Sequence, residues 1–130
     1  MTKTFLPDLI SHAGKPVTDI VNISSIAAHV PFPDYAVYAA TKAAVTTLSA
    51  MQPSEIGRHG VRVTNVEPGL TDTDLGTHID NPRLRAELQD MLATIPPMTA
   101  GDVADLVEFI VTRPPHVNLR HVVVLPTEQV

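Results

Sequence analysis

The sequence predicts a single α/β domain over residues 1–130, with a parallel sheet of about three strands and flanking helices. Three short apolar segments, at residues 19–24, 61–66 and 121–125, are rich in β-branched side chains and have the length of buried strands. Segments with helical spacing of apolar residues separate them. Because strands that alternate with helices form parallel sheets with right-handed crossovers, this order predicts one layered sheet.

The first expected helix lies at the N-terminus, where apolar residues recur at helical spacing until Gly14 and Pro16 end the pattern. These apolar residues are Phe5, Leu6, Leu9 and Ile10. A second helix is expected over residues 35–57, with Asp34 as its N-cap and an alanine-rich first half. Pro53 lies inside this helix. An interior proline costs about 3 kcal/mol, so we expect the helix to end early or bend there.

The C-terminal half is expected to be less regular. The pair Pro68-Gly69 forms a turn after the second strand, and residues 71–97 are polar, with a short helix at 83–93. Thr99 is expected to cap a further helix over residues 101–112, which precedes the last strand.

Composition narrows the possible partners. The net charge of −5 argues against nucleic acid and anionic membranes as partners, because both attract clusters of Lys and Arg. No apolar run approaches the roughly 20 residues that span a bilayer. The absence of cysteine excludes disulfides and thiolate metal sites and fits a cytoplasmic location. The six histidines, including His116 and His121, show no paired ligand spacing, so no metal site is expected.

Tyr38 and Lys42 are the first candidates for chemistry. They are four residues apart on an expected helix, which places both side chains on one face. A tyrosine phenol has a pKa of about 10, and a neighbouring ammonium group stabilises the phenolate that a catalytic base requires. By itself this spacing is common, and the alternative interpretation is a solvated lysine one turn after a surface tyrosine.

Ser25 strengthens the catalytic interpretation. It follows the first strand directly and precedes Tyr38 by thirteen residues. Ligand sites in open α/β sheets lie beyond the carboxyl ends of the strands, and a helix that starts after the loop can return Tyr38 to that edge. Ser24 is the weaker candidate, because its spacing to Tyr38 is one residue longer. Its expected role is a strand-end hydroxyl bonded to the backbone.

These segments together resemble a known family. Asn-Ile-Ser-Ser, Tyr-Ala-Ala-Thr-Lys-Ala-Ala-Val, Gly-Val-Arg-Val-Thr-Asn-Val-Glu-Pro-Gly and a closing Leu-Pro-Thr look like the second half of the short-chain dehydrogenase/reductase family, over nearly all of the chain. The resemblance implies a partial Rossmann-like fold, NADP or NAD as cofactor, and a small alcohol or carbonyl compound as substrate. The C-terminal segment is similar to the branch of broad-specificity, often NADP-dependent oxidoreductases that act on hydroxy acids and small alcohols.

The resemblance also implies roles for individual residues. Ser25 would hydrogen-bond the substrate oxygen, Tyr38 would donate or accept the proton, and Lys42 would assist the tyrosine and hold the nicotinamide ribose. Residues 70–94 would form the mobile substrate loop. The cofactor-binding residues would be Tyr38, Lys42, Pro68, Gly69 and either Thr71 or Thr73.

The family's glycine-rich turn, which receives the cofactor pyrophosphate at a helix N-terminus, has no counterpart among the six scattered glycines. We therefore expect a truncated domain that lacks the dinucleotide-binding half and is inactive alone. The catalytic asparagine of the family would also lie before Met1. Strand 19–24 is then expected to have a bare edge, which favours self-association into a homo-oligomer.

Two alternatives remain open. One is a non-catalytic fragment that oligomerises through helices 2–13 and 35–57, as relatives commonly do. The other is a minimal fold with a new small-ligand role for Ser25, Tyr38 and Lys42.

Overall fold

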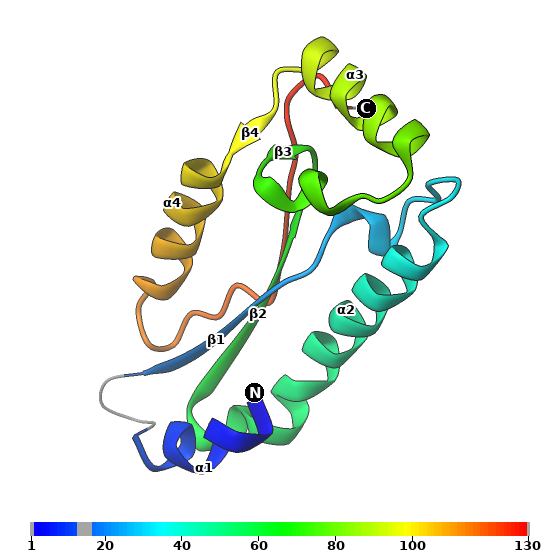
Figure 1. Cartoon of the computed structure of the whole chain (residues 1–130). Coiled ribbons are helices and arrows are strands. Elements are labelled where there is room, and N and C mark those ends of the chain that lie inside the picture. Colours follow the sequence, from blue (N-terminus) through cyan, green and yellow to red (C-terminus); the bar gives the residue numbers. More distant parts are fainter. Residues whose placement is uncertain (1, 13–16, 130) are drawn as a thin grey trace.

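The computed structural model describes residues 2–12 and 17–129 and confirms the α/β class (Figure 1). Three parallel strands form the main sheet in the order β1–β2–β5. Their bounds are Thr18–Ile23 for β1, Val61–Pro68 for β2 and His121–Val124 for β5. The strand that is second in sequence therefore lies at the centre of the sheet, and the expected three-stranded parallel sheet is confirmed.

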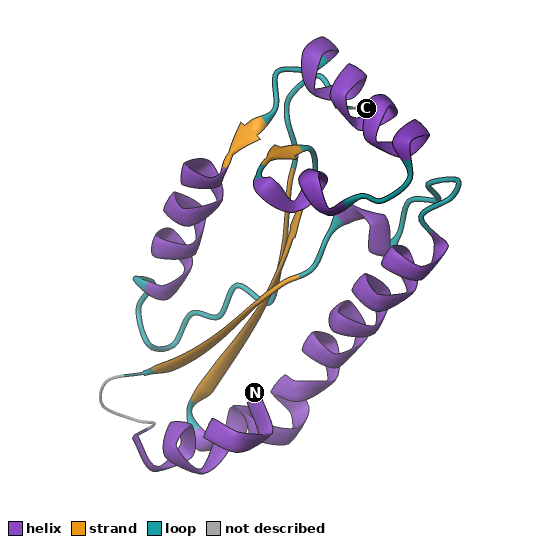
Figure 2. Ribbon diagram, in the orientation of Figure 1, coloured by secondary structure: helices purple, strands orange, loops and turns teal. Residues whose placement is uncertain are grey.

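Helices cover both faces of the sheet (Figure 2). Helices α1 (Thr2–His12) and α2 (Ala36–Ile56) lie on one face, and α4 (Ala100–Val111) lies on the other. The core on the α1/α2 face is built from buried residues of α2 and β2 with partly buried apolar side chains around them. These residues are Ile56, Val61 and Val63, surrounded by Leu6, Leu9, Ile10 and Ile20.

The N-terminal helix forms as expected, with one exception in its apolar stripe. Phe5 is 54% exposed, whereas Leu6, Leu9 and Ile10 pack against the core. The predicted stop at Gly14 and Pro16 lies outside the described residues. Within residues 2–12 and 17–129, no helix is both long enough and apolar enough to cross a membrane.

Strand β2 forms the buried centre of the small sheet. Every residue from 61 to 67 is buried, because β1 and β5 flank the strand and helices cover its two faces. Ile20 pairs with Val63, and Asn65 pairs with His121. The strand continues to Pro68, two residues beyond the expected end, because Pro68 still pairs with Val124 in β5.

The structure corrects the predicted N-cap of α2 and one of the two outcomes expected at Pro53. Asp34 is not its N-cap, because that position is occupied by Tyr35, and Asp34 instead adopts a left-handed backbone conformation with φ of 68°. Of the two outcomes expected at Pro53, an early end is excluded, since α2 continues to Ile56, and a bend stays a prediction. Gln52 and Ile56 are buried against the sheet, so tertiary packing offsets the hydrogen bond that the proline removes.

The segment between β2 and α4 is more ordered than its polar composition indicates. Its two ends pair as the short parallel strands β3 (Thr71–Asp72) and β4 (Met98–Thr99). Between them lie the 3₁₀ helix η3 (Asp74–His78) and α3 (Pro82–Thr94). The expected helix at 83–93 is confirmed. Short 3₁₀ helices also occur at η1 (Ile26–Ala28) and η2 (Gly57–His59).

The predicted cap of α4 is confirmed. Asp102 N–H donates to the Thr99 hydroxyl over 3.2 Å, while Thr99 N–H donates to the Asp102 carboxylate over 2.7 Å. This reciprocal capping box satisfies backbone donors that the first turn of a helix otherwise leaves unpaired.

Candidate functional site

The predicted catalytic serine lies at the carboxyl end of β1. Ser24 N–H donates to the Val66 carbonyl over 2.7 Å, so the pairing with β2 continues one residue past the end of β1. Ser25 follows and is buried. Its Oγ accepts a hydrogen bond from Ala27 N–H over 3.2 Å, which makes Ser25 the N-cap of η1. This hydroxyl is therefore held at the sheet edge where open α/β folds bind ligands.

Tyr38 and Lys42 meet on one face of α2, as their spacing predicts. Lys42 Nζ lies 5.6 Å from the centroid of the Tyr38 ring. The same ammonium donates a hydrogen bond to the carbonyl oxygen of Ile23, over 3.1 Å, at the last residue of β1. Lys42 thus connects the phenol to the strand end that leads into Ser25. Within the described part of the chain, the hydroxyls of Tyr38 and Ser25 do not bond each other.

Ser24 has the structural role that the sequence predicts for it. Its Oγ donates to the Lys42 carbonyl over 2.8 Å and shares a hydrogen bond of 2.9 Å with the Thr46 hydroxyl. Ser24 is 3% exposed. Since both contacts lie on α2, Ser24 fixes the helix against the strand end.

A second tyrosine, Tyr35, lies beside Tyr38. Tyr35 packs edge-on against Tyr38, with ring centroids 6.5 Å apart. Burial raises the pKa of Tyr35, and the carboxylate of Glu87 raises it further. A phenol with a raised pKa stays protonated at neutral pH, so Tyr35 is poorly suited to serve as a base.

The turn after β2 carries the residues predicted to line a cofactor. Gly69 allows a close approach, because a Cβ at this position would clash with the side-chain oxygen of Gln129. The same Gln129 oxygen accepts from Leu70 N–H over 2.7 Å. Thr71 donates its hydroxyl to the Gly69 carbonyl, and Thr73 caps η3. The C-terminal segment of the chain therefore lies directly against Gly69.

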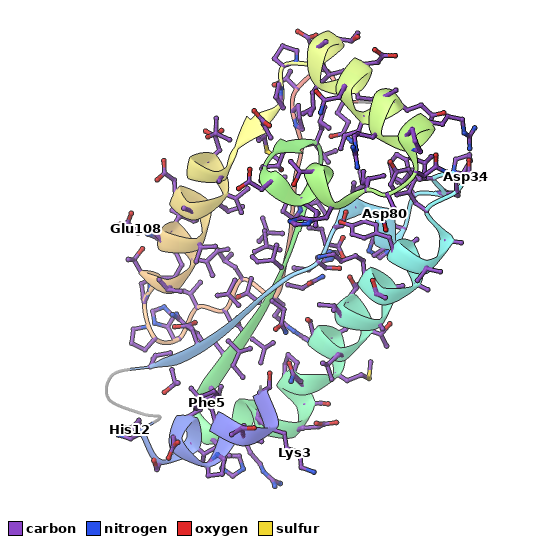
Figure 3. All side chains as sticks on the ribbon, in the orientation of Figure 1. Lys3, Phe5, His12, Asp34, Asp80 and Glu108 are labelled. Carbon is purple, nitrogen blue, oxygen red and sulfur yellow. The ribbon has the colours of Figure 1, made fainter. Side chains whose placement is uncertain are left out.

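The predicted substrate loop lies next to the start of α2. Arg83 in α3 forms an ion pair with Asp34, which Figure 3 shows at the end of the turn beside α3. A cavity of about 270 Å³ lies between this turn and α3. Its lining residues are Phe32, Pro33, Asp34, Tyr35, Arg83, Glu87, Leu88 and Met91. Asp34 thus combines a left-handed backbone conformation with an ion pair to α3 and does not cap α2.

A second polar cluster lies on the α2 face of the sheet, and sequence reasoning missed it. Glu67 is fully buried in β2, between His29 and His121. Burial alone would raise the pKa of Glu67, but the hydrogen bond from Thr46 and the contacts with the two imidazoles outweigh burial and lower the pKa. Glu67 therefore remains an ionised carboxylate beneath the surface. The loop after η1 supplies His29, and the pairing of β2 with β5 brings His121 near Glu67, so local spacing gives no signal for the cluster.

Comparison with known proteins matches this chain to dehydrogenases and reductases. A family model described as short chain dehydrogenase matches residues 1–83. The serine 3-dehydrogenase of Rhizobium radiobacter is 31% identical over 129 residues, which is 99% of this chain and 50% of that protein. A sulfoacetaldehyde reductase of Chromohalobacter salexigens is 36% identical over the same shares of both chains.

The backbone fold of this chain is also similar to that of a solved structure. The closed form of serine dehydrogenase complexed with NADP+ matches with a TM-score of 0.82 and 31% identity, over 95% of this chain and 49% of that one. The chain thus spans about half the length of the curated relatives that it matches.

Proposed function

Because this chain belongs to the short-chain dehydrogenase family, we propose that it carries the catalytic groups of an NAD(P)-dependent oxidoreductase for a small alcohol or carbonyl substrate. The observation that carries the proposal is the position of Lys42. Its ammonium group lies near the Tyr38 ring and is bonded to the end of β1 at Ile23. A fixed cation beside a phenol favours the phenolate and so suits the phenol to exchange a proton near neutral pH.

The three side chains then have distinct roles. The Tyr38 phenol donates a proton to the carbonyl oxygen during reduction and accepts it from the alcohol during oxidation. The Ser25 hydroxyl orients the same substrate oxygen from the strand end. Lys42 holds its ammonium group near Tyr38 through the bond to the Ile23 carbonyl. A bound nicotinamide would supply or accept the hydride at the substrate carbon.

We assign only the nicotinamide end of such a cofactor to the described residues. Tyr38, Lys42 and the turn residues Pro68, Gly69, Thr71 and Thr73 are proposed to line the nicotinamide end. For the pyrophosphate, by contrast, the sequence offers no two glycines separated by a single residue. We infer that the pyrophosphate and adenosine contacts are made outside these 130 residues. The chain alone is then expected to bind NADPH or NADH no more tightly than roughly millimolar and to be inactive.

The substrate is proposed to be small and polar. Two relatives are named for serine and for sulfoacetaldehyde, which are both short molecules with an acidic group. Serine with NADP+ and sulfoacetaldehyde with NADPH are therefore the first assays to run.

The test needs a protein that can bind the whole cofactor. We suggest a chimera in which this chain replaces the matching half of the Rhizobium radiobacter enzyme. In it, Tyr38→Phe should lower kcat by at least about 10²-fold and leave the Kd for NADPH nearly unchanged. Tyr35→Phe is the matched control and should keep its activity, because that phenol has a raised pKa. Retained turnover in Tyr38→Phe would remove Tyr38 from the proton-transfer role.

A non-catalytic, self-associating role is the second candidate, and two features favour it. Within the described residues β1 pairs only with β2, which leaves one strand edge open. The outer face of α2 also carries exposed apolar side chains, with Val37 81% exposed, Leu48 52% and Met51 54%. Both features favour a homo-oligomer, because exposed strand edges and apolar patches are common sites of association.

A further inference from the structure

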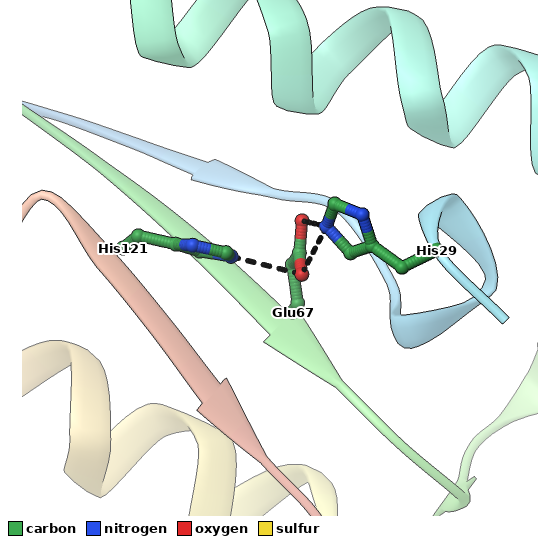
Figure 4. A group of neighbouring side chains, drawn as sticks. All are labelled: His29, Glu67 and His121. Atoms are coloured by element: carbon green, nitrogen blue, oxygen red, sulfur yellow. Dashed lines mark hydrogen bonds and ion pairs between the residues drawn. The ribbon is translucent and has the colours of Figure 1, made fainter.

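Two histidines and one glutamate converge on the α2 face of the sheet, and none of them is assigned to the oxidoreductase chemistry. His29 follows η1, Glu67 lies in β2, and His121 begins β5. Figure 4 shows the Glu67 carboxylate between the two imidazole rings, each of which directs a ring nitrogen toward it. Nε2 of His29 lies 3.0 Å from Glu67 Oε2, and Nε2 of His121 lies 2.9 Å from the same atom.

The carboxylate is held in a defined orientation. Its Oε1 accepts a hydrogen bond of 2.6 Å from the Thr46 hydroxyl and one of 2.8 Å from the Asn65 side-chain amide. Oε2, by contrast, accepts no well-directed hydrogen bond within the described residues, although it is buried. The two imidazole nitrogens approach Oε2 as ion-pair contacts, and Nε2 of His29 also lies within hydrogen-bond distance of Oε1, at 3.1 Å. A buried carboxylate oxygen without such a bond favours a cation beside it.

Two of the three groups can be reached from solvent. The side chains of His29 and His121 are 53% and 48% exposed, whereas Glu67 is not exposed at all. A cavity of about 220 Å³ adjoins the cluster and is lined by Thr46, Ser49, Ala50, Asn65, Arg120 and His121. An ion can therefore reach the carboxylate between the two rings, and the cavity leaves room for water.

The spacing suits a small cation. Ligand atoms of all three residues lie within 4.8 Å of one another. Two ligands at about 2.1 Å from a tetrahedral ion are about 3.4 Å apart, so small side-chain rotations separate the present contacts enough to admit one. We propose that His29, Glu67 and His121 bind one divalent transition-metal ion of the zinc type, through both imidazole Nε2 atoms and the carboxylate.

The two imidazole nitrogens and one carboxylate oxygen favour a transition-metal ion over Mg²⁺ or Ca²⁺. Two imidazoles and one carboxylate are typical ligands of Zn²⁺, whereas Mg²⁺ and Ca²⁺ prefer oxygen ligands alone. Three protein ligands leave one tetrahedral position for water. Thr46 and Asn65 act as positioning residues, because their hydrogen bonds fix the carboxylate that binds the ion. The site is independent of the proposed oxidoreductase function, since it uses neither Tyr38 nor a nicotinamide.

The experiment is a calorimetric titration of the metal-free 130-residue chain with Zn²⁺, followed by Co²⁺ absorption spectroscopy. We expect one ion per chain, tetrahedral ligand-field bands with Co²⁺, and no competition from Mg²⁺. His29→Gln and His121→Gln should each weaken binding by at least about tenfold, because even an outer-sphere partner contributes 10- to 100-fold. His116→Gln is the matched control, since His116 is an exposed histidine outside the cluster. This variant should bind Zn²⁺ with the same affinity as the original chain.

A second pair of variants separates the metal site from general stability. Thr46→Val removes the hydroxyl that orients Glu67 and should weaken Zn²⁺ binding about tenfold, whereas Thr46→Ser should restore it. Circular dichroism of the metal-free variants verifies that each is folded. The proposal is overturned if Zn²⁺ binds no better than millimolar, or if the His29 and His121 variants bind as tightly as the original chain.

Discussion

Arg62 in β2 and Asp19 in β1 form a buried, bidentate ion pair between the two longest strands of the sheet. Arg62 Nε donates to Asp19 Oδ1 and Nη2 donates to Oδ2, each over 2.8 Å. The same guanidinium also donates to backbone carbonyls at and after the end of α4, namely those of Val111, Arg113, Pro114 and Val117. Arg62 therefore joins β1, β2 and the segment that leads to β5.

Removing this guanidinium should destabilise the domain strongly. Arg62→Met leaves the Asp19 carboxylate uncompensated and removes a donor from four carbonyls, of which Pro114 keeps the bond from Val117 N–H. We expect a loss of about 3–5 kcal/mol in the free energy of unfolding. Urea denaturation measures this loss. Arg58→Met is the control on an exposed arginine and should change stability by less than about 0.5 kcal/mol. Equal stability of both variants would contradict the central role of Arg62.

The open edge of β1 and the apolar face of α2 predict self-association by two different surfaces. Ile23 is 44% exposed on β1, and Leu48 is 52% exposed on α2. Ile23→Lys places a charge at the strand edge, and Leu48→Lys places one on the helix face. Whichever variant lowers the sedimentation coefficient identifies the surface in use, because a charge opposes pairing there. A chain that is already monomeric at micromolar concentration would contradict both.

The capping box of α4 predicts a pH dependence of stability. The backbone N–H of Thr99 and then its hydroxyl hydrogen-bond the Asp102 carboxylate and lower its pKa below the ordinary 3.8. A carboxylate with a depressed folded-state pKa contributes stability that is complete above the ordinary pKa and is lost as pH falls through the folded value. The difference between the original chain and Asp102→Asn in urea midpoint should therefore be constant near neutral pH and shrink below pH 3.8.

Asp105→Asn serves as the comparison for that series. Asp105 is exposed on the same helix but takes no part in the capping box, so its substitution should have a smaller effect on the urea midpoint. Parallel pH profiles for the two variants would mean that the box contributes nothing specific.

Much of the fold follows from local sequence. The three strands, the helix capped by Thr99 and the neighbouring positions of Tyr38 and Lys42 all depend on spacings of a few residues, and all form as predicted. Asp34 shows the limit of local reasoning. Its residue type favours an N-cap, but its ion pair with Arg83, across a large sequence separation, is compatible with a different backbone conformation.

The His29, Glu67 and His121 cluster illustrates the same limit for a site. His29 and Glu67 are 38 positions apart, and His121 joins them through the pairing of β2 with β5. Strand register decides which side chains become neighbours, and a shift by one residue would turn Glu67 to the opposite face. No motif of fixed spacing can therefore reveal this cluster.

The short pairing of β3 with β4 has a consequence for how this family of chains can vary. Thr71 pairs with Met98 and Asp72 pairs with Thr99, so strand pairing holds the two ends of the intervening segment together. Lengthening a loop with fixed ends is cheap, at about 0.6 kcal/mol for each doubling of its length. The β3–β4 pairing thus permits large insertions or deletions in the segment between these strands, while β1, β2 and β5 keep their alignment.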